Sequence, residues 1–128
     1  MATSHNVELF SGEAGSAVTV YRMVVRAADG QFDMVSGAQG DMDGVAAESV
    51  SAVGGELPVA ALKTGSILKV EAGAAIAALA TVGSDASGRA ITAVSGAGNV
   101  QLGKALDAAS GAGEIIRVQI NKVLDQVT

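Results

Sequence analysis

The chain has 128 residues, a formal net charge of −5 and an uneven composition of 17 glycines, 25 alanines, three aromatic residues and no cysteine. Its length corresponds to a single domain, and its acidic balance argues against nucleic acid as a partner, because no basic excess is available to neutralise phosphates. The lack of cysteine and the presence of one histidine, His5, remove disulfides, thiolate chemistry and most imidazole chemistry, so most enzyme classes lose their usual reactive groups. We expect a protein that is not an enzyme and that uses no cofactor or metal.

The N-terminal residues carry no targeting signal. The first ten residues lack both the basic and the apolar stretch of a secretory signal, which predicts synthesis and use in a cytoplasm. The most apolar stretch, Ala72–Gly83, is shorter than the roughly 20 residues that span a bilayer, so no membrane is expected as a partner. We predict that residues 1–14 form an extended arm anchored by Leu9 and Phe10, and that residues 15–128 form one β-rich domain.

A hairpin is predicted directly after this arm. Residues Ala17–Arg26 alternate in side-chain character and are rich in β-branched side chains, which predicts a strand. The dipeptide Asp29-Gly30 follows and accepts the positive φ angles of a two-residue type I′ turn. Residues Gln31–Ser36 are then expected to form the returning strand.

Glycines divide the rest of the chain into segments of about five to ten residues, the spacing of short strands joined by tight turns. Pro58 cannot donate to a ladder and is expected at an edge position or a strand start. The alanine-rich segments Gly73–Leu79 and Lys104–Ala109 are ambiguous, because alanine favours helix. We keep an all-β fold, a small barrel or sandwich of short antiparallel strands. The expected strands are Val45–Val53, Glu56–Leu62, Ser66–Glu71, Ala75–Val82, Ala90–Val94, Val100–Ala108 and Glu114–Val123.

Two patterns suggest ligands. The acidic loop from Asp29 to Asp43 has many carboxylates, but position 12 counted from Asp41 is Ala52 rather than the glutamate of an EF-hand, so a solvated turn is favoured over calcium. The glycine pairs of residues 96–98 and 111–113 resemble parts of phosphate-binding loops, but neither is followed by Lys-Ser or Lys-Thr. We interpret both as turns.

Four arginines are candidate interface residues. An arginine side chain can bind a carboxylate of another subunit with two hydrogen bonds, although arginines on strands often face solvent. The scarcity of large core side chains also suggests a fold that gains stability by association. The candidates for an interface with another subunit or with a larger surface are Leu9, Phe10, Arg22, Arg26, Arg89 and Arg117.

The middle and C-terminal thirds resemble a known family. The runs from Ala72 to Ala77, from Val82 to Ala90, from Leu102 to Ala109 and from Ile115 to Ile120 are similar to the small capsid decoration proteins of tailed bacteriophages, also called cement proteins. The segment Tyr21–Val25 before an Asp-Gly turn and the segment Asp43–Ala46 fit the same pattern. The resemblance spans residues 15 to 122 and includes no reactive groups.

The resemblance implies a β-rich virion protein, made in the host cytoplasm, that binds the outside of the expanded phage head. It implies the major capsid protein as the partner and a homo-oligomer as the active form, for which a trimer suits the three-fold junctions of a hexamer lattice. We further predict that Ala2–Phe10 becomes ordered only on the capsid. The alternative is a free oligomeric β-barrel that binds a small molecule or a protein, although three aromatic rings provide little lining for a pocket. An enzyme that uses only Asp and Ser is a third reading.

Overall fold

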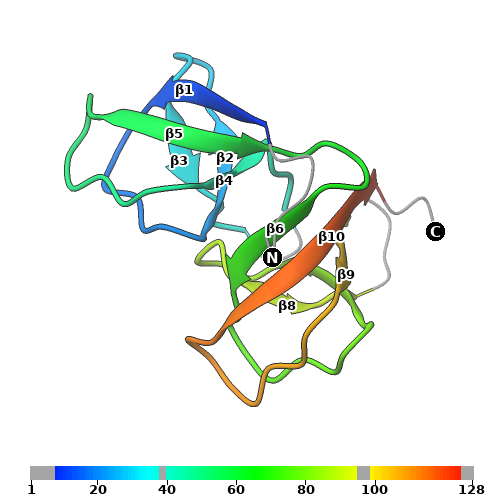
Figure 1. Cartoon of the computed structure of the whole chain (residues 1–128). Helices are drawn as coiled ribbons and strands as arrows, with labels where there is room; N and C mark the ends of the chain where they lie inside the picture. The colour runs from blue at the N-terminus through cyan, green and yellow to red at the C-terminus, as the bar shows by residue number, and fades with distance from the viewer. Residues whose placement is uncertain (1–7, 38–39, 95–98, 125–128) are drawn as a thin grey trace.

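The computed structural model describes residues 8–37, 40–94 and 99–124, and within these ranges every regular element is a β-strand (Figure 1). The strands form two separate antiparallel sheets of five strands each. In chain order the strands are β1 (Leu9–Glu13), β2 (Met23–Arg26), β3 (Phe32–Met34), β4 (Gly44–Ala46), β5 (Glu56–Ala61), β6 (Ile67–Glu71), β7 (Thr81–Ser84), β8 (Ala90–Thr92), β9 (Val100–Ala105) and β10 (Ile115–Leu124).

The all-β prediction is confirmed, and the structure is sandwich-like. The first sheet has the order β1-β5-β4-β2-β3 and the second has the order β6-β10-β9-β7-β8. Each sheet therefore keeps two edge strands. The barrel alternative is wrong, because neither sheet closes on itself.

The two sheets are copies of one topology, so the chain contains a tandem repeat, which was not predicted from the sequence. Residues 9–61 form the first repeat and residues 67–124 form the second. The parallel bridge between Ala14 and Phe32 recurs at the same place in the second repeat, between Ala72 and Ala90. Tyr21 has a φ of 67° and its counterpart Leu79 has a φ of 69°, the two non-glycine residues with positive φ in the described chain. Since an L-residue rarely adopts this conformation, its recurrence marks a duplicated backbone.

Glycine recurs where the duplicated backbone is most crowded. Gly44 in β4 lies against β5, where an added Cβ would stand 2.9 Å from the carbonyl oxygen of Ala60. Its counterpart Gly103 in β9 lies against β10, where an added Cβ would stand 3.0 Å from the backbone nitrogen of Asn121. At both positions the spacing of neighbouring strands leaves no room for a side chain, so glycine is required for packing.

One apolar core joins the two repeats. The larger buried cluster combines side chains of the second repeat, such as Leu102 and Ile116, with Met23, Val45 and Ala60 of the first. A smaller cluster, which includes Leu57 and Phe32, lies within the first repeat. The repeats thus share a continuous apolar interior. Figure 1 shows the two sheets beside each other. This shared core fixes the two sheets as one unit.

The predicted first strand is shorter than expected. Only Met23–Arg26 is strand, because the chain turns at Tyr21 and Val18 forms only an isolated bridge with Val50. The turn at Gly30 is not a two-residue type I′ turn: Ala27 N–H donates to the Gln31 carbonyl oxygen at 2.8 Å, so three residues lie between them. Gly30 supplies the positive φ of 87° that this longer turn needs.

Similar shortening occurs further along the chain. The segments predicted as strands from Val45, Ala75 and Val100 contain short strands followed or preceded by turns and bridges.

The alanine-rich segments 73–79 and 104–109 contain no helix. The two segments are instead joined to each other by the antiparallel bridge between Ile76 and Ala109. The expected turn at residues 111–113 is confirmed, and that at 96–98 lies outside the described residues.

Pro58 lies within β5, which has neighbours on both sides, so its assignment to an edge or a strand start is wrong. The ladder with β4 ends at Ala46, directly before the point at which Pro58 lacks its N–H. In the second repeat the equivalent N–H of Arg117 donates to the Asp107 side chain at 3.1 Å instead of to a strand. Proline is tolerated here because the regular ladder with β4 does not extend to this position.

Candidate interaction surfaces

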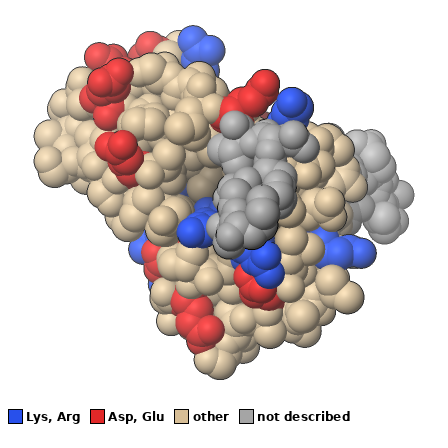
Figure 2. Space-filling view, in the orientation of Figure 1, with Lys and Arg blue, Asp and Glu red and all other residues tan. Residues whose placement is uncertain are grey.

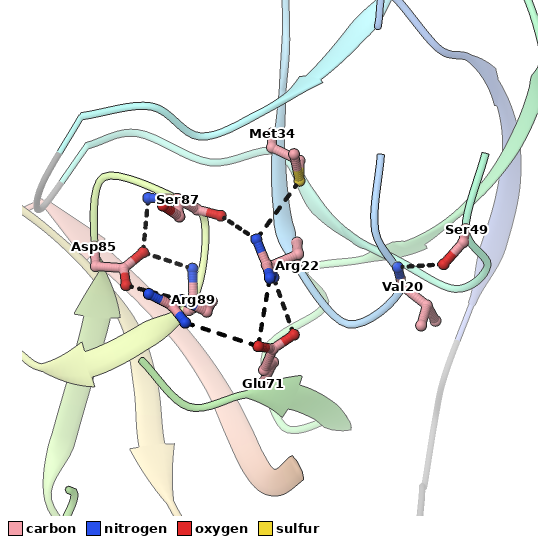
Figure 3. A network of polar contacts seen from close by, with 8 residues as sticks. All are labelled: Val20, Arg22, Met34, Ser49, Glu71, Asp85, Ser87 and Arg89. Atoms are coloured by element: carbon pink, nitrogen blue, oxygen red, sulfur yellow. Dashed lines mark hydrogen bonds and ion pairs between the residues drawn. The ribbon is translucent and has the colours of Figure 1, made fainter. Parts of the chain in front are cut away.

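An ion-pair network connects the two repeats (Figure 3). Arg22 of the first repeat donates from Nε to Glu71 Oε1 of the second at 3.0 Å and from Nη1 to the Ser87 carbonyl oxygen at 3.1 Å. Arg89 lies 4.0 Å from the other Glu71 oxygen and donates from Nε to Asp85 Oδ2 at 3.2 Å. The side chains of Arg22 and Glu71 are only 18% and 15% exposed, so the pair is partly shielded from water.

Backbone contacts reinforce this network. Glu71 N–H donates to the Tyr21 carbonyl oxygen at 3.0 Å, and Met23 N–H donates to the Gly88 carbonyl oxygen at 2.7 Å. A Cβ on Gly88 would lie 2.8 Å from the Met23 carbonyl oxygen, so only glycine permits this close approach. The segment Tyr21–Met23 is therefore seated on the second repeat by side-chain and main-chain contacts together.

A second contact between the repeats involves Lys122 of β10. Its Nζ lies 2.8 Å from Asp41 Oδ1 and donates to the Met42 carbonyl oxygen at 2.7 Å. The hydrogen bond from Lys122 holds the pKa of the Asp41 carboxyl below its ordinary value. A lowered folded-state pKa means that the contact stabilises the protein above the unfolded-state pKa and loses this contribution as the pH falls through the folded-state pKa.

The Asp41→Asn variant therefore tests this pH dependence. We expect it to be less stable than the parent at pH 7, by about 0.5 kcal/mol because Asp41 is largely exposed, and to lose this difference as the pH falls through the lowered folded-state pKa of Asp41. Urea denaturation at pH 7 and pH 2.5 measures the difference. The Glu48→Gln variant, which changes an exposed carboxylate, is the control. A difference for Asp41→Asn that persists unchanged at pH 2.5 would contradict the assignment.

Two shallow surface grooves occupy equivalent places in the two repeats. In the first repeat the groove is lined by Leu9, Phe10, Ser11, Glu48, Glu56 and Pro58. In the second it is lined by Tyr21, Lys69, Asp107, Ile115, Ile116 and Arg117. Figure 2 shows acidic side chains gathered over β1 and β5 of the first repeat. The charged side chains that line the first groove are thus all acidic, whereas those that line the second are both basic and acidic. Each groove also contains exposed apolar side chains.

The predicted interface residues fall into three groups. Leu9 and Phe10 lie in β1, paired with β5, and are 60% and 40% exposed; Phe10 also contacts Phe32 with ring centroids 5.7 Å apart. Residues 9–13 of the predicted arm therefore belong to the first sheet, whereas residues 1–7 lie outside the described residues. Arg22 and Arg89 are used inside the chain, in the network between the repeats.

The other two arginines lie nearer the surface. Arg117 pairs with Asp107 through two hydrogen bonds of 2.9 Å, and this pair lowers the pKa of Asp107. Arg26 is exposed in β2, and its backbone N–H donates to the Asp43 carboxylate at 2.8 Å. Both remain predicted interface residues.

The acidic loop does not converge on one point. Asp29 accepts from Gln31 N–H at 2.9 Å, Asp33 accepts from Ser16 Oγ at 2.9 Å and Asp41 pairs with Lys122. Across the described ranges, no group of three or more His, Asp or Glu side chains is arranged to hold a metal ion. The same ranges contain no helix that is long and apolar enough to span a membrane.

Comparisons with known proteins agree with this architecture. Residues 10–120 match a family model described as phage cement protein. A search of curated proteins finds no match. Among solved structures, the chain is similar to the head fiber gp8.5 N base of bacteriophage phi29, with a TM-score of 0.71 and 20% identity over 90% of this chain and 94% of that chain. At this identity the structural likeness supports the fold.

The family match covers most of the chain, including both repeats. It also agrees with the resemblance found in the sequence. Phage cement proteins are structural components of the virion, and the chain is not an enzyme. This protein belongs to the phage cement protein family.

Proposed function

We propose that the protein binds the outer surface of the expanded phage capsid and stabilises the shell against the pressure of the packaged DNA. The observation that carries this proposal is the family match over residues 10–120. The major capsid protein is the partner, and a homo-oligomer, with a trimer favoured, is the bound form. The protein is made in the host cytoplasm and joins the head after expansion.

Stabilisation follows from mass action. A protein that binds the assembled shell but not its separated subunits stabilises the shell by its binding free energy, and many copies multiply the effect. The described features suit this role, because the two repeats share one core and are held by ion pairs and backbone hydrogen bonds. Such a unit can connect two capsid subunits with little loss of its own conformational freedom.

Co-sedimentation with expanded, undecorated heads tests the proposal. We expect saturable binding, together with a rise of several degrees in the temperature at which the heads release DNA. Unexpanded proheads serve as the control and should bind fewer copies. A folded protein that fails to sediment with expanded heads would contradict the proposal and favour a free binding module.

A further inference from the structure

The tandem repeat contains a template for a docking contact. On the second repeat, Glu71 and the turn Ser87–Arg89 receive the segment Tyr21–Met23 of the first repeat. The receiving groups are the Glu71 N–H and carboxylate and the carbonyl oxygens of Ser87 and Gly88. The segment of the first repeat provides the carbonyl oxygen of Tyr21, the side chain of Arg22 and the N–H of the apolar residue Met23. These contacts define the ligand chemistry that this surface recognises.

The first repeat carries the same surface, here called the docking surface, made by Glu13 and the turn Asp29–Gln31. Glu13 corresponds to Glu71, and Gly30, with a φ of 87°, corresponds to Gly88, with a φ of 78°. The Gln31 side chain donates to Glu13 Oε1 at 2.9 Å, just as Arg89 faces Glu71 in the second repeat. The first repeat therefore has the same turn conformation and the same carboxylate that hold the segment Tyr21–Met23 on the second repeat.

No described residue occupies the docking surface. A Cβ added to Gly30 would meet only Arg26 Nη2, at 3.8 Å, whereas one added to Gly88 would collide with Met23 of the other repeat. Glu13 is exposed and Gly30 is half-buried, whereas Gly88 is buried. β1 is an edge strand of the first sheet, so the backbone groups that face away from β5 form a row from Glu13 to the exposed Leu9. The first repeat thus presents an open copy of a surface that is filled on the second.

We propose that the docking surface binds an extended segment of the major capsid protein that contains an arginine followed by an apolar residue. This inference rests on the proposed function for the identity of the partner. The arginine would pair with Glu13, and the backbone of the segment would bond to the Glu13 N–H and the Gly30 carbonyl oxygen, as Arg22 and its neighbours do on the second repeat. Glu56 lies opposite Glu13 in the ladder between β1 and β5, and Asp29 accepts from the N–H of Gln31, whose side chain donates to Glu13. These carboxylates favour a basic segment.

A second copy of the chain fits the docking surface less well. The segment of the second repeat that corresponds to Tyr21–Met23 is Leu79–Thr81, which contains no arginine. The apolar residues Val45 and Ala60 that support Tyr21–Met23 in the shared core correspond to Lys104 and Gln119, which are exposed. A polar outer face of this kind is typical of a terminal repeat that ends an array. The open surface is therefore assigned to a different protein.

A peptide tests the recognition chemistry without a capsid. The probe has the sequence of residues 20–24, Val-Tyr-Arg-Met-Val, with both ends blocked, and the control probe has alanine in place of arginine. We expect millimolar probe to shift the amide resonances of Glu13 and Gly30 and to leave those of Glu71 and Gly88 unchanged, because that surface is filled. The control probe should give smaller shifts. Absence of shifts at Glu13 and Gly30 would overturn the proposal.

Binding to expanded heads tests the identity of the partner. The Glu13→Gln variant should bind about tenfold more weakly than the parent, since it loses a charged hydrogen-bond partner. The Glu114→Gln variant changes the same charge at an exposed site of the second repeat and should bind like the parent. Equal affinities of the Glu13→Gln and Glu114→Gln variants would overturn the proposal.

Two further outcomes separate the explanations. Shifts at Glu13, Leu79 and Thr81 that grow with protein concentration, with no probe added, would identify a second copy as the occupant and overturn the assignment to the capsid. Failure of the parent protein to bind heads would refute both the proposed function and the capsid as occupant, whereas the peptide titration would still decide whether Glu13 and Gly30 form a docking surface.

Discussion

Replacement of Gly103 by alanine is expected to destabilise the protein by about 3 kcal/mol, which corresponds to a fall of roughly 10 °C in Tm. The added Cβ would collide with the carbonyl oxygen of Gln119 and lie 3.0 Å from the nitrogen of Asn121, and both are backbone atoms of β10. Backbone cannot rotate away as a flexible side chain can. Strands β9 and β10 would therefore have to separate, next to the register shift that follows Ile120. Thermal and urea denaturation measure the loss.

The Gly111→Ala variant is the matched control, because an added Cβ there meets no atom within 4 Å. It should be neutral or more stable by about 0.5 kcal/mol, since alanine reduces the freedom of the unfolded chain. The repeat also predicts that Gly44→Ala will be destabilised like Gly103→Ala, because Ala60 and Val59 crowd the equivalent position. Equal stabilities of Gly103→Ala and Gly111→Ala would contradict the close approach of β9 and β10.

The Glu71→Ala variant is expected to lose about 2 to 3 kcal/mol of stability, less than the loss typical of a fully buried pair. It leaves Arg22 and Arg89 facing each other without the carboxylate that both of them approach. The two arginine side chains are only partly exposed, at 18% and 29%, so water screens the repulsion between their charges incompletely. Denaturation in urea at neutral pH measures this loss.

A double-mutant cycle with Arg22→Met isolates the pair. We expect the double variant to be more stable than the sum of the single losses predicts, by about 1 to 2 kcal/mol, because removal of both charges leaves neither unpaired. Lys63→Ala is the control, since Lys63 and Glu8 are exposed and 3.7 Å apart, and an exposed pair of this kind contributes little to stability. A loss for Glu71→Ala no larger than this control would contradict the role of the network.

The sequence was sufficient to predict an all-β chain because its glycine spacing and β-branched runs act locally. The segments Glu56–Leu62 and Ser66–Glu71 were predicted almost to the residue, as β5 and β6. The segment Ala17–Arg26 was overextended, because alternation continues through Tyr21, where a positive φ turns the chain. Nothing in the local pattern distinguishes that tyrosine from a strand residue.

The tandem repeat could have been found from the sequence. Glu13-Ala14-Gly15 recurs as Glu71-Ala72-Gly73, and Gly30, Gly44 and Gly54 recur as Gly88, Gly103 and Gly113. The relation is concealed because the offset between the copies changes between Gly30 and Gly44, and because few other positions are identical.

The internal use of Arg22 and Arg89 could not have been predicted. Their partner, Glu71, is brought to them by the packing of one repeat on the other. The docking surface likewise becomes visible only when the two repeats are compared in three dimensions, because its open and filled forms have the same backbone.

An electron cryo-microscopy reconstruction of expanded heads saturated with the protein tests the central claim most directly. Our account predicts additional density on the outer surface that fits both five-stranded sheets, with Glu13 and Gly30 against the major capsid protein and Leu79 away from it. Density on the inner surface, or heads that remain bare in the presence of excess folded protein, would contradict a role in capsid decoration.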